Sequence, residues 1–125
     1  MRLLLDTHAL LWALGDPEEL ADEARSAIVD PENLVVVSAA STWEIAIKRA
    51  LGKLKAPRDV RGALDASGFV ALPITVEHCV AAGALPARHR DPFDRMLVAQ
   101  ARIEHLVVVT RDPRFALYSV DVLAA

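Results

Sequence analysis

Five carboxylate residues occupy positions in this sequence from which they could do chemistry. Asp6 directly follows a short apolar stretch, and Asp112 closely follows another. Glu44 lies near the start of an amphipathic stretch, and Asp91 and Asp94 lie at the start of a second one. Oxygen ligands without paired histidines suit a hard cation such as Mg²⁺ or Mn²⁺. Because such an ion can activate a water molecule for in-line attack on phosphorus, the pattern favours hydrolysis of a phosphate ester, provided that the acids meet.

Each of these acids also has a purely structural explanation. Asp6 could cap the helix that follows it. Ser41 and Glu44 have the spacing of a capping box, and Asp91-Pro92-Phe93-Asp94 fits a helix start with a cap, a proline and an acid. Asp112 precedes a proline and could begin a turn. Taken singly, these explanations are the better ones, but they do not explain why all five acids would reach one edge of a sheet.

The elements that must position the acids can be predicted from the pattern of apolar residues. Short apolar stretches without alternation are typical of parallel strands buried on both faces. The predicted strands are residues 3–5, 34–37, 69–72 and 106–109, with 118–122 as a possible short fifth. Amphipathic stretches and capping residues predict the helices between them. The first is residues 7–14, and the second is capped by Asp16 and runs through Ile28. The third is opened by Ser38 or Ser41 and ends before Gly52, and the fourth runs from Ala56-Pro57 to about Gly68. The last two run from Thr75 to about Gly83 and from Asp91-Pro92 to about His105.

Strands that alternate with helices predict a single α/β domain over residues 1–125. We expect a parallel sheet of four to five strands with helices on both faces. The C-terminal ends of parallel strands lie on one edge of the sheet, and a helix that leads into a strand begins at that same edge. The five acids are therefore predicted to gather at one rim, which is where open α/β sheets bind ligands.

The composition restricts the location and the partners of the chain. Hydrophobic residues make up 54% of the 125 residues, but no apolar run approaches the roughly 18 to 20 residues that cross a membrane. The N-terminus lacks the pattern of a signal peptide, and the single cysteine, Cys79, fits a reduced cytosol. We therefore expect a cytoplasmic protein with Cys79 in its core. A formal net charge of -3 is not that of a protein that holds duplex nucleic acid by charge alone, so any nucleic-acid contact must be local.

The remaining motifs do not point to another chemistry. The four histidines show no zinc-type spacing. His8 is expected to be a helix residue near the acids, and His89 is expected to be structural rather than an RNA contact. The sequence has neither a glycine-rich dinucleotide motif nor a phosphate-binding Gly-Lys-Ser/Thr loop, and no serine sits in a nucleophile elbow.

Four stretches together resemble the PIN-domain nucleases and, within them, the VapC-type toxins of type II toxin–antitoxin pairs. They are Leu4-Leu5-Asp6-Thr7-His8-Ala9-Leu10-Leu11-Trp12, Ser38-Ala39-Ala40-Ser41-Thr42-Trp43-Glu44-Ile45, His89-Arg90-Asp91-Pro92-Phe93-Asp94-Arg95-Met96-Leu97 and Thr110-Arg111-Asp112. The resemblance covers nearly the whole chain. It implies metal-dependent cleavage of single-stranded or loop RNA, inhibition by a cognate antitoxin protein, and a homodimer.

The resemblance also implies which acids form the site. The family's four acids around one or two Mg²⁺ ions fall on Asp6, Glu44, Asp94 and Asp112, and Mn²⁺ could substitute for Mg²⁺. Asp94 is preferred to Asp91 on the family pattern only, since helical geometry does not exclude Asp91. We expect Asp6 and Asp94 to be the main ligands and Asp112 to complete the site or hold a second ion. Glu44 is expected to orient or deprotonate the attacking water, or to bind the ion through water.

Residues around the acids have supporting roles in this hypothesis. Thr7 and Thr110 are expected to hydrogen-bond the carboxylates. Lys48, Arg90 and Arg95 are candidate contacts to RNA phosphates, and solvated surface charges are the alternative for them. Trp12 and Trp43, near the predicted rim, could be core residues or part of a partner surface.

Other functions are compatible with the same sheet. A phosphoryl-accepting receiver domain needs an aspartate where Leu72-Pro73 stands, and a haloacid-dehalogenase-type phosphatase needs one where His8 stands. Another metal-dependent phosphoryl hydrolase of these kinds is therefore disfavoured. A binding module with the same fold but without turnover remains an alternative, although the complete set of acids argues against it.

Overall fold

Strand β1 (Arg2–Leu5) lies at the centre of a five-stranded parallel sheet. The computed structural model describes all residues 1–125, and the strand order is β3-β2-β1-β4-β5. The other strands are β2 (Leu34–Ser38), β3 (Val70–Leu72), β4 (Val107–Thr110) and β5 (Val122–Ala124). β1 pairs with β2 on one side, where Leu4 is opposite Val36, and with β4 on the other, where Leu4 is opposite Val108. The predicted parallel sheet of an α/β domain is thus confirmed.

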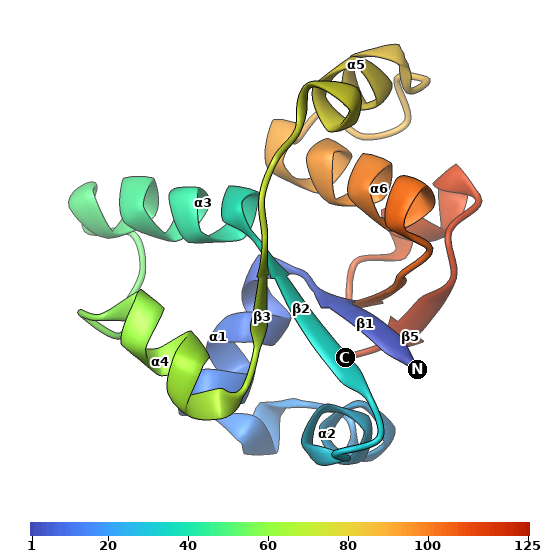
Figure 1. Ribbon diagram of the computed structural model, residues 1–125. Coiled ribbons are helices and arrows are strands. Elements are labelled where there is room, and N and C mark those ends of the chain that lie inside the picture. The colour runs from blue at the N-terminus through green and yellow to red at the C-terminus, as the bar shows by residue number, and fades with distance from the viewer.

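Helices cover both faces of this sheet (Figure 1). Helices α1 (Thr7–Gly15), α2 (Asp22–Val29) and α4 (Val60–Ser67) pack on the face that carries Leu3 and Leu5. Helix α6 (Pro92–Glu104) and the 3-10 helix η2 (Pro113–Tyr118) pack on the face that carries Leu4, and α5 (Val76–Ala84) lies beyond α6. Alternate side chains of β1 therefore enter two separate cores, which explains why all three leucines are fully buried.

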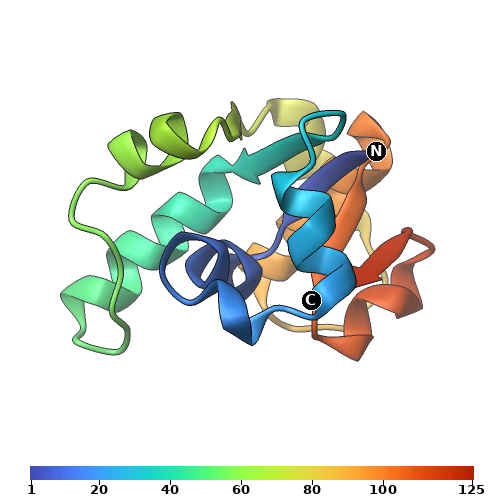
Figure 2. The same cartoon turned by 90° about the horizontal axis from the view of Figure 1, so that it is seen from below.

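Helix α3 (Ala39–Ala50) follows β2 and extends outward from the sheet in both views (Figures 1 and 2). Ile45 of this helix is buried in the core that contains Leu3 and Leu5. Trp43 and Ile47 of the helix, and Leu51 directly after it, are exposed. No helix in the structure has the length and apolar character needed to span a bilayer.

Two predicted helix starts were wrong. The helix expected from Asp16 is divided into a short 3-10 helix, η1 (Pro17–Glu19), and α2, and Asp16 makes no side-chain cap. Leu20 separates them in an extended conformation, because its side chain is buried in the core. The helix expected from Ala56-Pro57 begins only at Val60, since the Asp59 carboxylate caps it by accepting the main-chain N–H of Gly62 at 2.9 Å.

Two predictions for the later part of the chain also need correction. The fifth strand is Val122–Ala124 rather than 118–122, because Tyr118 belongs to η2 and is buried against the second core. Cys79 is exposed rather than buried, since α5 turns His78 toward α6 and the next residue outward. The Thr75 cap of α5 and the Asp91 start of α6 agree with the predictions.

A glycine at the end of α4 gives a test of the local geometry. Gly68 has φ +73°, a left-handed conformation that costs an L-residue about 1–2 kcal/mol. Gly68→Ala should therefore lower the free energy of unfolding by about 1 kcal/mol in urea titrations. Gly15→Ala, at the end of α1, is the matched control, because an added Cβ meets nothing within 4 Å there and φ is ordinary. Equal losses in the two variants would contradict this explanation.

Candidate active site

The five acids singled out in the sequence line one cavity of about 190 Å³. They are Asp6, Glu44, Asp91, Asp94 and Asp112. Asp6 directly follows β1, Asp112 lies between β4 and η2, Glu44 lies in the second turn of α3, and Asp91 and Asp94 lie at the start of α6. Because every strand is parallel, the C-terminal ends of β1 and β4 meet at one edge of the sheet. The structure thus brings together residues that are more than one hundred positions apart.

Asp6 is both a helix cap and a member of the cluster. Its Oδ1 accepts the main-chain N–H of Ala9 at 2.8 Å, which caps α1. Its Oδ2 accepts the hydroxyl of Thr110, at the end of β4, at 2.5 Å. The side chain is buried, and this burial raises the pKa of the Asp6 carboxyl above its ordinary value. The structural and the chemical explanation of Asp6 are therefore compatible.

Glu44 is not part of a capping box. Ser38 caps α3 by accepting the N–H of Ala40 at 3.0 Å, so Glu44 lies in the second turn, and the hydroxyl of Ser41 is buried without a partner. The Glu44 side chain is buried and accepts the Thr7 hydroxyl at 2.5 Å on Oε1. Lys48 donates to Oε2 at 2.5 Å, one helical turn further on. This hydrogen bond raises the pKa of Lys48.

Asp91 and Asp94 have different roles at the start of α6. Asp91 caps the helix, since its Oδ1 accepts the N–H of Phe93 at 2.8 Å and of Asp94 at 3.3 Å. Asp94 projects into the cluster. Burial, followed by the negative charges of Asp91, Asp6, Glu44 and Asp112, raises the pKa of Asp94 to about 7. The geometry therefore distinguishes the two acids, between which helical spacing alone could not choose.

Asp112 is held in its charged form by a neighbouring arginine. Arg114 donates Nε to both carboxylate oxygens of Asp112, at 3.0 Å and 3.2 Å, and Nη2 to Oδ2 at 2.8 Å. The main-chain N–H of Arg114 adds a bond at 2.9 Å that caps η2. These bonds lower the pKa of Asp112 to about 2. The Arg114 side chain is itself exposed.

His89 is a member of the cluster that the sequence did not predict. It is buried, and its Nε2 lies 2.8 Å from Oδ2 of Asp94 and 3.4 Å from Oδ2 of Asp112. One potential ligand atom from each of the three residues lies within 4.8 Å of the others. From the sequence, His89 was expected to be structural, since the four histidines show no zinc-type spacing. Its position two residues before a helix-capping aspartate is the one local signal that could have placed it near the site.

The cations around the acids differ from those expected. Lys48 lines the cavity, but Arg90 is exposed and does not. Arg95 is turned away and donates to four main-chain carbonyls, those of Ala82, Leu85, Pro86 and His89, at 2.8–3.3 Å. The structure therefore gives Arg95 the role of holding the loop before α6, in place of the phosphate contact suggested by its charge.

Arg111 and Arg114 line the cavity instead of Arg90 and Arg95. The Arg111 guanidinium stacks over the half-buried Trp12 ring at 4.1 Å and is anchored to the main-chain carbonyls of Glu19 and Ala125. Trp12 also lines the cavity, whereas Trp43 is 62% exposed and meets Phe93 edge-on with ring centroids 5.4 Å apart.

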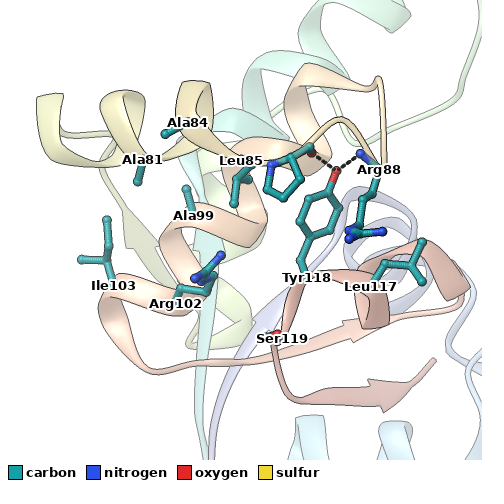
Figure 3. A pocket seen from close by; sticks show the side chains of 11 residues that line it. Ala81, Ala84, Leu85, Arg88, Ala99, Arg102, Ile103, Leu117, Tyr118 and Ser119 are labelled. Atoms are coloured by element: carbon teal, nitrogen blue, oxygen red, sulfur yellow. Dashed lines mark hydrogen bonds between the residues drawn. The ribbon is translucent and has the colours of Figure 1, made fainter.

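A larger cavity than the acidic one lies elsewhere in the protein (Figure 3). It has a volume of about 660 Å³ and lies between α5, α6 and η2. The Tyr118 hydroxyl in its wall donates to the Pro86 carbonyl and accepts the N–H of Arg88, so its polar group is already satisfied. Most of its lining residues are apolar and none is acidic. Size therefore does not identify the candidate site, because the five acids line the smaller cavity.

The residues of the acidic cavity fit a divalent cation. Five carboxylates face only three cationic lysine and arginine side chains there, and one of these, Arg111, is engaged with main-chain carbonyls. Burial raises the pKa of Asp94 most, and this excess of negative charge raises it further. Oxygen donors at such a density are the ligands that Mg²⁺ and Mn²⁺ prefer.

Comparison with known families and structures agrees with this geometry. The family model described as PIN domain matches residues 3–121. No curated protein sequence matches the chain. The fold is similar to that of VapBC2 from Rickettsia felis bound to a DNA fragment from their promoter, with 15% identity over 98% of each chain and a TM-score of 0.72.

Two further solved structures share the fold. DNA-bound VapBC from Salmonella typhimurium has 17% identity over 98% of this chain and 97% of that one, with a TM-score of 0.71. A toxin–antitoxin complex from Klebsiella pneumoniae has 20% identity over 98% of this chain and 96% of that one, with a TM-score of 0.63. At these identities the similarity establishes a common fold.

The raised pKa of Asp94 predicts how the metal-free protein responds to pH. The folded state holds the proton up to about pH 7, whereas the unfolded chain releases it near the ordinary value of 3.8. In chelator, the stability should therefore fall as the pH rises from about 4 to about 7, by about 2–4 kcal/mol from this group. Asp94→Asn should remove this part of the slope and should be at least as stable as the parent at neutral pH.

Asp65→Asn, on the exposed surface of α4, is the matched control, because it removes a carboxylate that does not line the acidic cavity. Thermal melts in chelator at several pH values measure all three proteins. If Asp94→Asn is instead less stable than the parent at neutral pH, then the favourable interaction of Asp94 with the N-terminus of α6 exceeds the repulsion within the cluster.

Proposed function

The chain belongs to the PIN domain family, and we propose that it is a Mg²⁺-dependent endoribonuclease that cleaves single-stranded or loop RNA as the toxin of a toxin–antitoxin pair. The observation that carries the proposal is the convergence of five carboxylates in one cavity, with a buried aspartate whose pKa is raised to about 7. A cluster of carboxylates in which the pKa of one member is raised in this way is typical of a site that binds a cation.

Asp6, Asp94 and Asp112 would hold the ion, with Mn²⁺ as a possible substitute. A bound divalent cation lowers the pKa of a coordinated water and neutralises charge on a phosphodiester. Asp94 must give up its proton to act as a ligand, whereas Asp112 is already charged because of Arg114. Asp6 keeps a fixed orientation, since one oxygen is bound by Thr110 and the other by the N-terminus of α1.

Glu44 would orient the attacking water or accept its proton. The Thr7 hydroxyl and the Lys48 ammonium each occupy one of its oxygens, and each oxygen keeps a second lone pair for the water. Lys48 and Arg114 lie in the same cavity and would contact the phosphate that undergoes attack. Thr7 and Thr110 thus support the reaction by orienting Glu44 and Asp6.

The charge distribution favours a flexible RNA strand as the substrate. The chain has a formal net charge of -3, and the cations that line the cavity are Lys48, Arg111 and Arg114. A duplex needs many phosphate contacts over a broad basic surface. A few local cations suffice for a loop or a single strand, which can bend its phosphate toward the acids.

A panel of unstructured and hairpin RNAs tests the enzymatic activity. We expect cleavage with Mg²⁺ or Mn²⁺ and none with chelator. Asp6→Asn retains a helix-capping side chain but loses a ligand, so cleavage should fall by more than the roughly 10- to 100-fold typical of losing an outer partner at a metal site. Asp65→Asn on the exposed surface of α4 serves as the control and should cleave like the parent. A folded protein that cleaves none of these RNAs with either metal would be a binding module without turnover.

An antitoxin partner is the second part of the proposal. The similar structures include a toxin–antitoxin complex and two VapBC assemblies on DNA. In this chain, Trp43 and Ile47 of α3 and Leu51 at its C-cap form an exposed apolar stripe, with residue exposures of 62%, 36% and 63%. An apolar stripe of this kind is typical of a surface that binds a partner. We propose that an antitoxin protein covers it, that the chain also forms a homodimer, and that both assemblies exist in the cytoplasm.

Growth assays test the toxin role. Strong expression of the chain alone should arrest growth of a bacterial host, and Asp6→Asn should abolish the arrest while the protein accumulates to the same level. Co-expression of a short open reading frame from beside the gene should restore growth. Robust growth with abundant, folded parent protein would contradict the toxin role but not the nuclease activity.

A further inference from the structure

Three contacts fix the plane of the Arg111 guanidinium in the wall of the acidic cavity. Its central carbon lies 4.1 Å from the centroid of the Trp12 ring, so the two groups are stacked. Nε donates to the main-chain carbonyl of Ala125 at 3.1 Å, and Nη2 donates to that of Glu19. Trp12 in turn packs against the core on the α1 side of the sheet. Arg111 and Trp12 therefore form one layered side of the cavity that both residues line.

These contacts occupy the N–H groups that an arginine uses to bind phosphate. A phosphate binds a guanidinium in its plane, through two parallel N–H groups. In Arg111, Nε and Nη2 are already bound to main-chain carbonyls, and Nη1 alone has no partner. The residue is nevertheless exposed, and the indole covers one face of the guanidinium. The opposite face and Nη1 are what remain for a ligand, so Arg111 offers a flat cationic surface rather than a phosphate clamp.

A nucleobase is the ligand that suits this surface. Bases of single-stranded RNA stack on aromatic side chains and on guanidinium planes. Trp12 is the one hydrophobic residue among the eleven that line the cavity, and it lies directly behind the guanidinium. The carboxylates of the same cavity are proposed to act on a phosphodiester, which brings the base of an adjoining nucleotide close to this wall. The acids and the flat surface thus correspond to two parts of one RNA strand.

We propose that Arg111, backed by Trp12, is the stacking surface for the base of a nucleotide next to the scissile phosphate. This inference rests on the proposed function and deepens it, because it names what the site requires of its RNA: one unstacked base beside the bond that is cleaved. A base within a duplex is held between its neighbours and does not reach the surface. Since preferences at such surfaces follow stacking strength, a purine should be favoured over a pyrimidine at one flanking position.

Mononucleotides test the stacking surface without any cleavage. Adenosine monophosphate and the matching ribose phosphate carry the same phosphate, but only the first has a base. In calorimetry with Mg²⁺, the base should strengthen binding by roughly 5- to 150-fold, the factor that corresponds to stacking one base on an aromatic side chain. In a Trp43→Phe protein, Trp12 is the remaining tryptophan, and its fluorescence should change with adenosine monophosphate. Equal affinities for the two compounds, or an unchanged Trp12 signal, would overturn the proposal.

Arg111→Lys separates the flat surface from the positive charge. Lysine keeps the charge but has no plane on which a base can stack, so most of the advantage of adenosine monophosphate over ribose phosphate should be lost. Arg61→Lys, on the exposed surface of α4, is the matched control and should keep it. Arg111 also links Glu19 to Ala125. If that link were its only role, Arg111→Lys would melt earlier but keep the ratio of the two affinities, which would contradict the proposal. The comparison in the parent protein stands even if Arg111→Lys does not fold.

Cleavage of RNA gives a separate test. An RNA that the parent protein cleaves at one bond is remade with an abasic residue on one side of that bond and then on the other. One of the two abasic residues should slow cleavage by the parent, and the same change should matter little to Arg111→Lys. If neither abasic residue slows the parent, this inference fails while the nuclease activity stands. If the protein cleaves no RNA but binds adenosine monophosphate more tightly than ribose phosphate, the proposed function fails while the stacking surface stands.

Discussion

Repulsion among carboxylates at one edge of the sheet is the constraint on which the structure of the site depends. Five acids share a small cavity, and without compensation their charges would oppose folding. Three of the four proposed site acids have neighbours that donate hydrogen bonds to them and so reduce this cost. Thr110 donates to Asp6, Thr7 and Lys48 donate to Glu44, and Arg114 donates to Asp112. The charge of Asp94 is the least compensated, and its raised pKa indicates that this carboxyl retains its proton more readily than an ordinary aspartate does.

The fold brings these carboxylates close together and also supplies some of the hydrogen-bond donors that stabilise them. Parallel strands direct Asp6 and the Thr110–Asp112 segment to the same edge, and the helices that begin there present free N–H groups to the acids. Asp6, Asp91 and Asp112 each accept such an N–H. Capping and chemistry were competing explanations for these acids in the sequence, but the structure shows that one carboxylate can cap a helix and also line the acidic cavity.

The sequence was informative where the position of a residue follows from regular strands and helices. The unalternating strands and the order of strands and helices were enough to predict the parallel sheet and the shared rim of Asp6, Glu44, Asp94 and Asp112. It was uninformative where a side chain is fixed by contacts across the chain. His89 and Arg95 lie in or beside an irregular loop, and their roles depend on carboxylates and carbonyls that only folding brings near. Local capping rules also failed at Asp16, where burial of Leu20 interrupts the helix.

The double use of the capping acids limits how such a site can change in evolution. A descendant that no longer needed catalysis would still need a hydrogen-bond acceptor at Asp6 to begin α1 and at Asp112 to begin η2. Selection for stability alone would therefore retain aspartate, or replace it with asparagine or serine, long after selection for turnover had ended. Glu44 is under no such second constraint, because Ser38 caps its helix. Among relatives of this chain, the residue at the position of Glu44 should therefore report on enzymatic activity more faithfully than the residue at the position of Asp6.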